Sequence, residues 1–296
     1  LGCFFVDNYW RIKSLPLAIA VVFGGLIQII FILIMIKKYK IFDLNNSVSN
    51  RSNKSLNDQI QFQLSQTWKK FLPAAFGGGI LQINLLVDTV LASLLGFGSI
   101  SYLYFADRIA QLPLGIIGIA LGTTLLTSLS KSTAIKDANQ FSKELIISFK
   151  IGLFFSIPAA AVFINFSDIL IKSLFERGEF SFQETMQTSN ALIAYAIGIP
   201  AFIMLKSCQP AFLAEGNTKT PMYIGFILLI LNIVLSFSLM TYLKHAGIAL
   251  ATSVASWIGT IIYISLLIKN GKIRKPIFSF QEEDSNLFSV ILYSFK

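Results

Sequence analysis

Long apolar runs separated by short polar segments dominate this chain. An α-helix rises 1.5 Å per residue, so about 20 apolar residues cross the roughly 30 Å hydrocarbon core of a bilayer. The runs that are long enough lie at about 15–36, 71–95, 109–130, 145–166, 185–205, 220–243 and 246–268. The pattern predicts an all-α polytopic membrane protein with about seven complete transmembrane helices. Apolar runs at 1–6 and 287–295 predict partial spans at both ends.

The longest polar segment, 37–70, predicts a boundary between two parts of the protein. It begins with KKYK, ends with WKK and has the Asn/Ser-rich middle NNSVSNRSNKSLND, which has too few apolar residues to bury a core. We therefore predict four regions. These are the end of an N-terminal lobe (1–36), a cytoplasmic linker (37–70), the helices of a C-terminal lobe (71–268), and a cytoplasmic loop with a truncated last span (269–296).

Several residues modify this picture locally. Lys150 and Pro158 predict an interruption of the fourth span, and the fifth span is expected to continue past Cys208 to Ala214. Gly118 and Gly122 form a GxxxG pattern, which we interpret as a helix-packing surface. His245, the one histidine of the chain, falls in a short predicted loop, where a solvated position is expected.

Basic residues in the loops predict the orientation in the membrane. Alternate loops are richer in Lys and Arg, and loops of this kind usually face the cytoplasm. This rule places segments 37–70, 131–144, 206–219 and 269–275 on the cytoplasmic side.

Composition narrows the classes of function. The chain of 296 residues is 54% hydrophobic and 13% charged, whereas a soluble domain carries about 25% charged residues. The net charge of +9 comes from loop residues without a basic nucleic-acid-binding face. No GxxxxGK[ST] loop occurs, so neither nucleic acid nor nucleotide is expected as a partner. Cys3 and Cys208 stand far apart and suggest neither a disulfide framework nor a metal site.

Ionisable residues inside the apolar runs are the candidate functional residues. Asp107 and Arg108 stand at the head of the third span, where each charge costs about 2.5–3.5 kcal/mol at a helix centre unless it faces a partner or water. The alternative is an arginine that reaches the membrane interface. Asp88 lies within the second span, and its alternative is a hydrogen-bonded packing residue.

Three sequence blocks carry a family resemblance. They are YFADRIAQLPLGIIGIALGT at 104–123, LFERGEF at 174–180 and PAFLAEGNTKTP at 210–221. With these blocks in this order, the chain resembles the bacterial lipid II flippase family (MurJ/MviN type) of the multidrug/oligosaccharidyl-lipid/polysaccharide exporter superfamily. The resemblance implies a two-lobed transporter of fourteen helices, of which this chain is similar to the sixth to twelfth, without most of the N-terminal lobe.

The resemblance also implies a function. Members of the family translocate lipid II, the undecaprenyl-diphosphate-linked peptidoglycan precursor, across the bacterial cytoplasmic (inner) membrane for cell wall synthesis. The expected partners are this lipid-linked precursor and membrane lipids, and the expected mechanism is alternating access without enzymatic chemistry. Arg108, with Asp107 beside it, matches a substrate-binding arginine of the family. A guanidinium suits that role because it grips a diphosphate with a fork of donors and stays charged.

A sodium site in the C-terminal lobe is a further implication of the resemblance, and no other cofactor is expected. The matching residues here are Asp88, Asn232, Ser236, Thr252 and the carbonyl of Ile248. Oxygen ligands on facing helices suit a hard cation. The family example has a second carboxylate where this chain has Ser236. The alternative for Asn232 and Thr252 is hydrogen bonding between helices without an ion.

Two other functions remain open at this point. The first is an ion-coupled exporter of amphipathic cations, as in the multidrug branch of the same superfamily. Such a cargo would favour carboxylates and aromatic side chains over Arg108. The second is a truncated, non-transporting membrane product.

Overall fold

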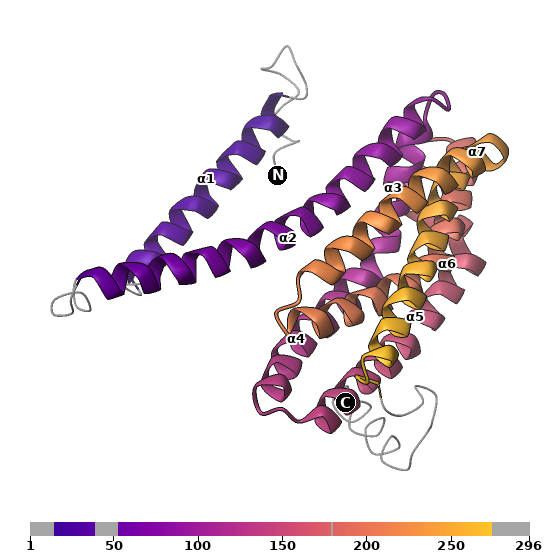
Figure 1. Ribbon diagram of the computed structural model, residues 1–296. Coiled ribbons are helices and arrows are strands. Elements are labelled where there is room, and N and C mark those ends of the chain that lie inside the picture. Colours follow the sequence, from indigo (N-terminus) through magenta and orange to yellow (C-terminus); the bar gives the residue numbers. More distant parts are fainter. Residues whose placement is uncertain (1–14, 39–52, 179, 274–296) are drawn as a thin grey trace, which may run out of the picture. The chain divides into compact units, whose positions relative to one another are not determined.

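The computed structural model describes residues 15–38, 53–178 and 180–273 (Figure 1). The described residues form helices and short turns, with no strand among them. The chain divides into two units, 1–64 and 65–296, and each is described by itself. The helices are α1 (Leu15–Lys38), α2 (Asn53–Ser93), α3 (Ser99–Pro113), α4 (Ile119–Ala134), α5 (Ala138–Phe175), α6 (Phe182–Leu213) and α7 (Lys219–Lys269), with a π-helical segment at Leu114–Gly118.

The predicted polytopic helical fold is confirmed. Five helical stretches among the described residues are long and apolar enough to cross a membrane: 67–93, 99–134, 138–175, 182–213 and 219–269. The last stretch, α7, folds back on itself, so its two arms correspond to the sixth and seventh predicted spans (Figure 1). Helix α1 covers the first predicted span. The partial spans predicted at both ends, and Cys3, lie outside the described residues.

Two helices extend beyond the spans that hydropathy predicts. Helix α2 begins at Asn53, so residues 53–70 of the predicted linker are helical. Their polar sequence hides the helix from a hydropathy pattern, although nothing in it breaks a helix. Helix α3 continues through the π-helical segment into α4, which gives an uninterrupted stretch of 36 residues from Ser99 to Ala134. The rest of the predicted linker, 39–52, lies outside the described residues.

Helix α6 is the central element of the second unit. It packs against α3, α4, α5 and α7, and 72% of its apolar stretch is buried, compared with 22% for the α3–α4 stretch. Its N-terminus carries a capping box. The Ser181 side chain accepts a hydrogen bond from the backbone of the first turn, and the Glu184 carboxylate accepts one from the Ser181 backbone N–H. Around it, side chains such as Ile157 and Ile169 of α5 are exposed, as expected where lipid surrounds the protein.

The fold-back of α7 is a tight turn at Lys244, whose φ of 53° interrupts the helix. The arms, 219–243 and 245–269, then run alongside each other (Figure 1). A Cβ on Gly247 would lie 2.4 Å from the Leu239 carbonyl oxygen, closer than real Cβ atoms approach backbone. Glycine at 247 is therefore required for the close approach of the two arms.

Two local predictions were wrong. Helix α5 is continuous through Lys150 and Pro158, and its backbone departs from helical angles only at Phe166. His245 is buried, with 4% of its surface exposed, and its Nε2 lies 2.9 Å from the carbonyl oxygen of Gln187 on α6. The fold-back of α7 turns this short loop inward against α6, which a sequence pattern does not reveal.

The GxxxG surface packs as predicted. A Cβ on Gly122 would lie 3.2 Å from the Lys206 carbonyl oxygen of α6, and one on Gly118 would lie 3.5 Å from Cγ of the same lysine. The two glycines therefore let the end of the π-helical segment and the start of α4 approach α6 closely, the usual use of this motif in membranes.

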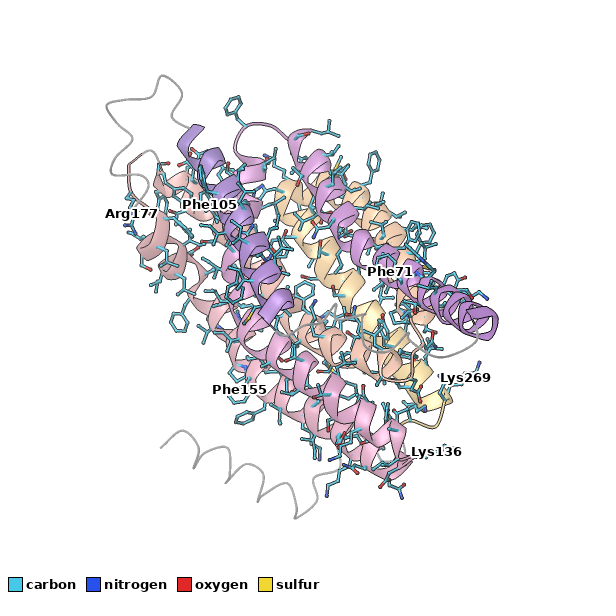
Figure 2. All side chains as sticks on the ribbon, turned by 90° about the vertical axis from the view of Figure 1, so that its left-hand side faces the viewer. Phe71, Phe105, Lys136, Phe155, Arg177 and Lys269 are labelled. Carbon is cyan, nitrogen blue, oxygen red and sulfur yellow. The ribbon has the colours of Figure 1, made fainter. Side chains whose placement is uncertain are left out.

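Three of the four segments predicted to be cytoplasmic meet at one end of the second unit. Lys272 forms an ion pair with Glu215, and its Nζ lies 5.3 Å from the centroid of the Phe141 ring. Lys136 and Lys269 mark this end, and Arg177 marks the opposite one (Figure 2). The arrangement agrees with the alternation of loop charge, while the side that faces the cytoplasm stays a prediction.

The Gly247 contact generates a prediction about stability. Gly247→Ala should lower the thermal unfolding temperature of the chain in detergent micelles, because overpacking of this kind costs about 1–3 kcal/mol. Gly225→Ala is the matched control in the same helix, since its Cβ would meet only Ile80 side-chain carbons at 3.6 and 3.7 Å. The control should be neutral or slightly stabilising. Equal unfolding temperatures for the two variants would contradict the proposed role of Gly247.

Candidate functional site

A polar cluster lies where α2 meets both arms of α7. Asn232 Nδ2 donates a hydrogen bond to Asp88 Oδ1 at 3.1 Å, and Thr252 Oγ1 donates to Asp88 Oδ2 at 3.4 Å. Both oxygens of the carboxylate are thus engaged, one by each arm of α7. This pairing offsets the cost of placing a carboxylate in an apolar bundle.

The cluster is built from three pairs of residues, each spaced four apart on one helical segment, so that both members share a face. Asn84 and Asp88 lie on α2, Asn232 and Ser236 on the first arm of α7, and Ile248 and Thr252 on the second arm. Asn232 Nδ2 also donates to Asn84 Oδ1 at 2.7 Å, and Ser236 Oγ donates to Asn232 Oδ1 at 3.3 Å. Thr252 Oγ1 also bonds the Ile248 carbonyl oxygen at 3.2 Å.

The structure brings together all five residues that were predicted to form the cation site. Asn232, Ser236 and Ile248 are buried, with at most 2% of their surface exposed, while Asp88 and Thr252 are partly buried. Asn84 belongs to the same network and was missed. Its signal in the sequence is an asparagine four residues before the only carboxylate of its span.

The donor set fits a monovalent hard cation. Its oxygens come from one carboxylate, two side-chain amides, two hydroxyls and one backbone carbonyl, the ligand types that sodium-like ions take in place of water. Among the described residues, no three His, Cys, Asp or Glu side chains come together, so neutral oxygens dominate here. The network satisfies hydrogen bonds by itself as well, and the sodium role stays a prediction.

A cavity of about 410 Å³ opens beside the cluster. Its walls are mainly apolar side chains of α2, α6 and α7, and Asn84, Asn232 and Thr252 form part of its lining. Lys206 and Gln209 of α6 also line it, and Lys206 is the one charged residue among the described residues of the lining. The predicted continuation of the fifth span to Ala214 includes Lys206, and α6, which ends at Leu213, confirms that continuation; the loop-charge pattern counts the same lysine in segment 206–219.

Arg108 lies outside this lining, on the exposed face of α3. Its guanidinium carbon lies 4.7 Å from the centroid of the Tyr104 ring, one helical turn earlier. The neighbouring Asp107 is partly buried and accepts a hydrogen bond from the side-chain amide of Gln111. The Arg108 guanidinium therefore packs on an aromatic ring and carries its charge on the outer face of α3. Its role in substrate binding stays a prediction.

The two predicted sites lie near each other on α2 and α3. Asp107 is close enough to Asp88 for their charges to interact. The turn of α3 that carries Asp107 and Arg108 therefore lies within electrostatic range of the polar cluster.

Comparison with known proteins assigns the chain to a family. The family model "Lipid II flippase MurJ" matches residues 1–294. The "Probable lipid II flippase MurJ" of Rickettsia prowazekii (strain Madrid E) is 34% identical over 262 residues, which are 88% of this chain and 50% of the relative. The "Probable lipid II flippase MurJ" of Rhizobium meliloti (strain 1021) is 40% identical over 200 residues, 68% of this chain and 37% of that protein.

Solved structures agree with this assignment. The chain is similar to "Lipid II flippase MurJ, inward closed conformation", with a TM-score of 0.63 and 29% identity over 90% of this chain and 52% of that one. An outward-facing multidrug-resistance MATE transporter, with a TM-score of 0.60 and 16% identity over 72% of this chain and 46% of its own, shows the same fold. The chain spans about half the length of the curated relatives it matches. The chain belongs to the MurJ family of lipid II flippases.

Proposed function

We propose that this chain provides the C-terminal-lobe helices of a flippase that moves lipid II across the cytoplasmic membrane. The observation that carries the proposal is the match of the family model along residues 1–294. The process is translocation, in which no covalent bond is made or broken. Alternating access around a solvated interior supplies the path, because a charged headgroup cannot cross hydrocarbon unaided.

Arg108 is the proposed contact for the diphosphate of the cargo. It stands inside an apolar stretch, is exposed, and lies over the Tyr104 ring, so its guanidinium is presented at the surface of α3. An inside-negative potential of 100 mV favours outward movement of each negative charge by about 2.3 kcal/mol. A diphosphate that pairs with Arg108 would therefore be driven toward the outer leaflet once the solvated interior of the transporter opens to that side.

Sodium at the Asp88 cluster is the proposed coupling ion. Asp88 supplies the one full negative charge, Thr252 and the Ile248 carbonyl supply neutral oxygens from the second arm of α7, and the Asn232 amide lies beside them on the first arm. A bound cation would cancel the charge of Asp88 and hold α2 against the α7 arms. Release of the cation would free these elements to move.

The main competing function is export of amphipathic cations, as in multidrug transporters. The similarity to those structures, at 16% identity, concerns the fold alone. Lys206, the one charged group in the described part of the lining of the 410 Å³ cavity, would repel a cationic cargo and attract an anionic one. The flippase reading is therefore favoured.

Replacing Arg108 tests the cargo contact. In a hybrid in which this chain replaces the matching half of the Burkholderia cenocepacia relative (29% identical), Arg108→Ala should slow lipid II translocation about 10- to 100-fold, the loss expected for a charge-assisted hydrogen bond. Growth of a strain depleted of its own flippase reports the loss. Arg108→Lys should retain part of the activity, because the charge remains without the fork.

Lys131→Ala, at the exposed end of α4, is the control for that experiment and should leave growth unchanged. Normal growth with Arg108→Ala at normal protein levels would contradict the proposed contact. If the hybrid with the unchanged sequence of this chain enters the membrane but fails to sustain growth, the proposed function is contradicted.

Replacing Asp88 tests the ion. The unchanged chain should unfold at a higher temperature in sodium chloride than in potassium chloride, because bound sodium raises the free energy of unfolding by about 2.7 kcal/mol when sodium exceeds its Kd 100-fold. Asp88→Asn keeps the size of the side chain but removes its charge, so the difference between the two salts should disappear. Asp168→Asn, on an exposed position of α5, should keep the difference. If Asp88→Asn still unfolds at a higher temperature in sodium chloride than in potassium chloride, Asp88 is not a sodium ligand.

A further inference from the structure

The orientation of the Asn232 amide is the starting point. Its Nδ2 faces two acceptors on α2, Asn84 Oδ1 at 2.7 Å and Asp88 Oδ1 at 3.1 Å. Its Oδ1 faces the Ser236 hydroxyl at 3.3 Å. The network dictates this orientation, because only the NH₂ group can satisfy two facing acceptors. The side of Asn232 nearest to Asp88 is therefore a nitrogen, which cannot serve as a ligand for a hard cation.

Rotation of this amide by half a turn would change the character of the site. The terminal torsion of asparagine is soft and nearly two-fold, so the side chain accommodates both orientations in the same space. After rotation, Asn232 Oδ1 would face Asp88 and Asn84, and Nδ2 would face Ser236. A serine hydroxyl both donates and accepts, so Ser236 can bond either end of the amide.

Asn84 becomes decisive in the rotated orientation. Its Oδ1 would lose the hydrogen bond from Asn232 and would converge with an amide oxygen and a carboxylate oxygen, with no donor among them. Three converging oxygens without a proton are satisfied by a cation. Asn84 lines the 410 Å³ cavity, while Asp88 does not, so Asn84 lies on the side from which an ion would arrive.

We propose that Asn84 is a ligand of the cation held at Asp88, and that the Asn232 amide is a two-position element that presents nitrogen without the ion and oxygen with it. The proposal rests on the cation site of the proposed function. The ligands then comprise one carboxylate and neutral oxygens, from Asn84, Asn232, Thr252 and the Ile248 carbonyl. This set neutralises a monovalent cation, whereas a divalent cation would leave a net charge in the bundle.

Binding of radioactive ²²Na⁺ to the chain purified in detergent micelles tests the Asn84 ligand. Asn84→Ala should weaken sodium binding about tenfold or more, within the range for losing a supporting group of a metal site. Gln82→Ala, an exposed amide two residues away on α2, should bind like the unchanged chain. Asn84→Asp is nearly isosteric and should bind calcium, which the unchanged chain should not, because a second carboxylate favours a divalent ion.

The outcomes separate this inference from the site itself. If the unchanged chain binds sodium and Asp88→Asn does not, but Asn84→Ala and Asn84→Asp retain the unchanged sodium affinity and gain no calcium binding, the Asn84 ligand is overturned and the Asp88 site stands. If sodium binding is absent from the unchanged chain, the cation site fails, and this inference fails with it. Growth of the hybrid strain reports on lipid II translocation independently of both.

The amide rotation has its own measurement. Asn232→Asp has oxygens on both sides and no NH₂ group to bridge Asn84 and Asp88 in the absence of sodium. The sodium-dependent rise in unfolding temperature should therefore be larger in this variant than in the unchanged chain. An equal or smaller rise would overturn the two-position role of the amide, while leaving the Asn84 result to stand separately.

Discussion

The partners of the Asp88 carboxylate are the interaction on which the rest of the second unit depends. A carboxylate inside an apolar bundle is tolerated only when hydrogen bonds or a counter-ion offset its lost hydration. Here the two partners, Asn232 and Thr252, lie 144 and 164 residues further along the chain, on opposite arms of α7. The carboxylate thus specifies how α2 meets α7, where apolar packing alone would allow several registers.

The number and place of the apolar helices were predictable because membrane spans leave a direct record in hydropathy. The family membership, together with the five apolar helical stretches, also confirms the prediction of a multi-pass protein of the bacterial inner membrane. The five residues of the Asp88 cluster were assigned from the family resemblance, and the structure brings them together. The four-region division and the substrate role of Arg108 stay predictions.

The features that the sequence did not reveal depend on contacts between distant segments or on polar helices. Hydropathy does not register the polar first turns of α2. The burial of His245 follows from the fold-back of α7 against α6. Asn84 was missed because the sequence does not show that Asn232 lies opposite it, and this contact is what identifies Asn84 as a member of the cluster.

The tight turn at Lys244–Gly247 has a mechanical consequence for the cluster. The tight turn holds the two arms of α7 close together, with Asn232 on the first arm and Thr252 on the second. Helix α2 contributes Asn84 and Asp88 from one face, four residues apart. Any sliding of α2 against α7 strains the three hydrogen bonds between them at the same time, those from Asn232 to Asn84 and Asp88 and that from Thr252 to Asp88, so these three bonds should break together.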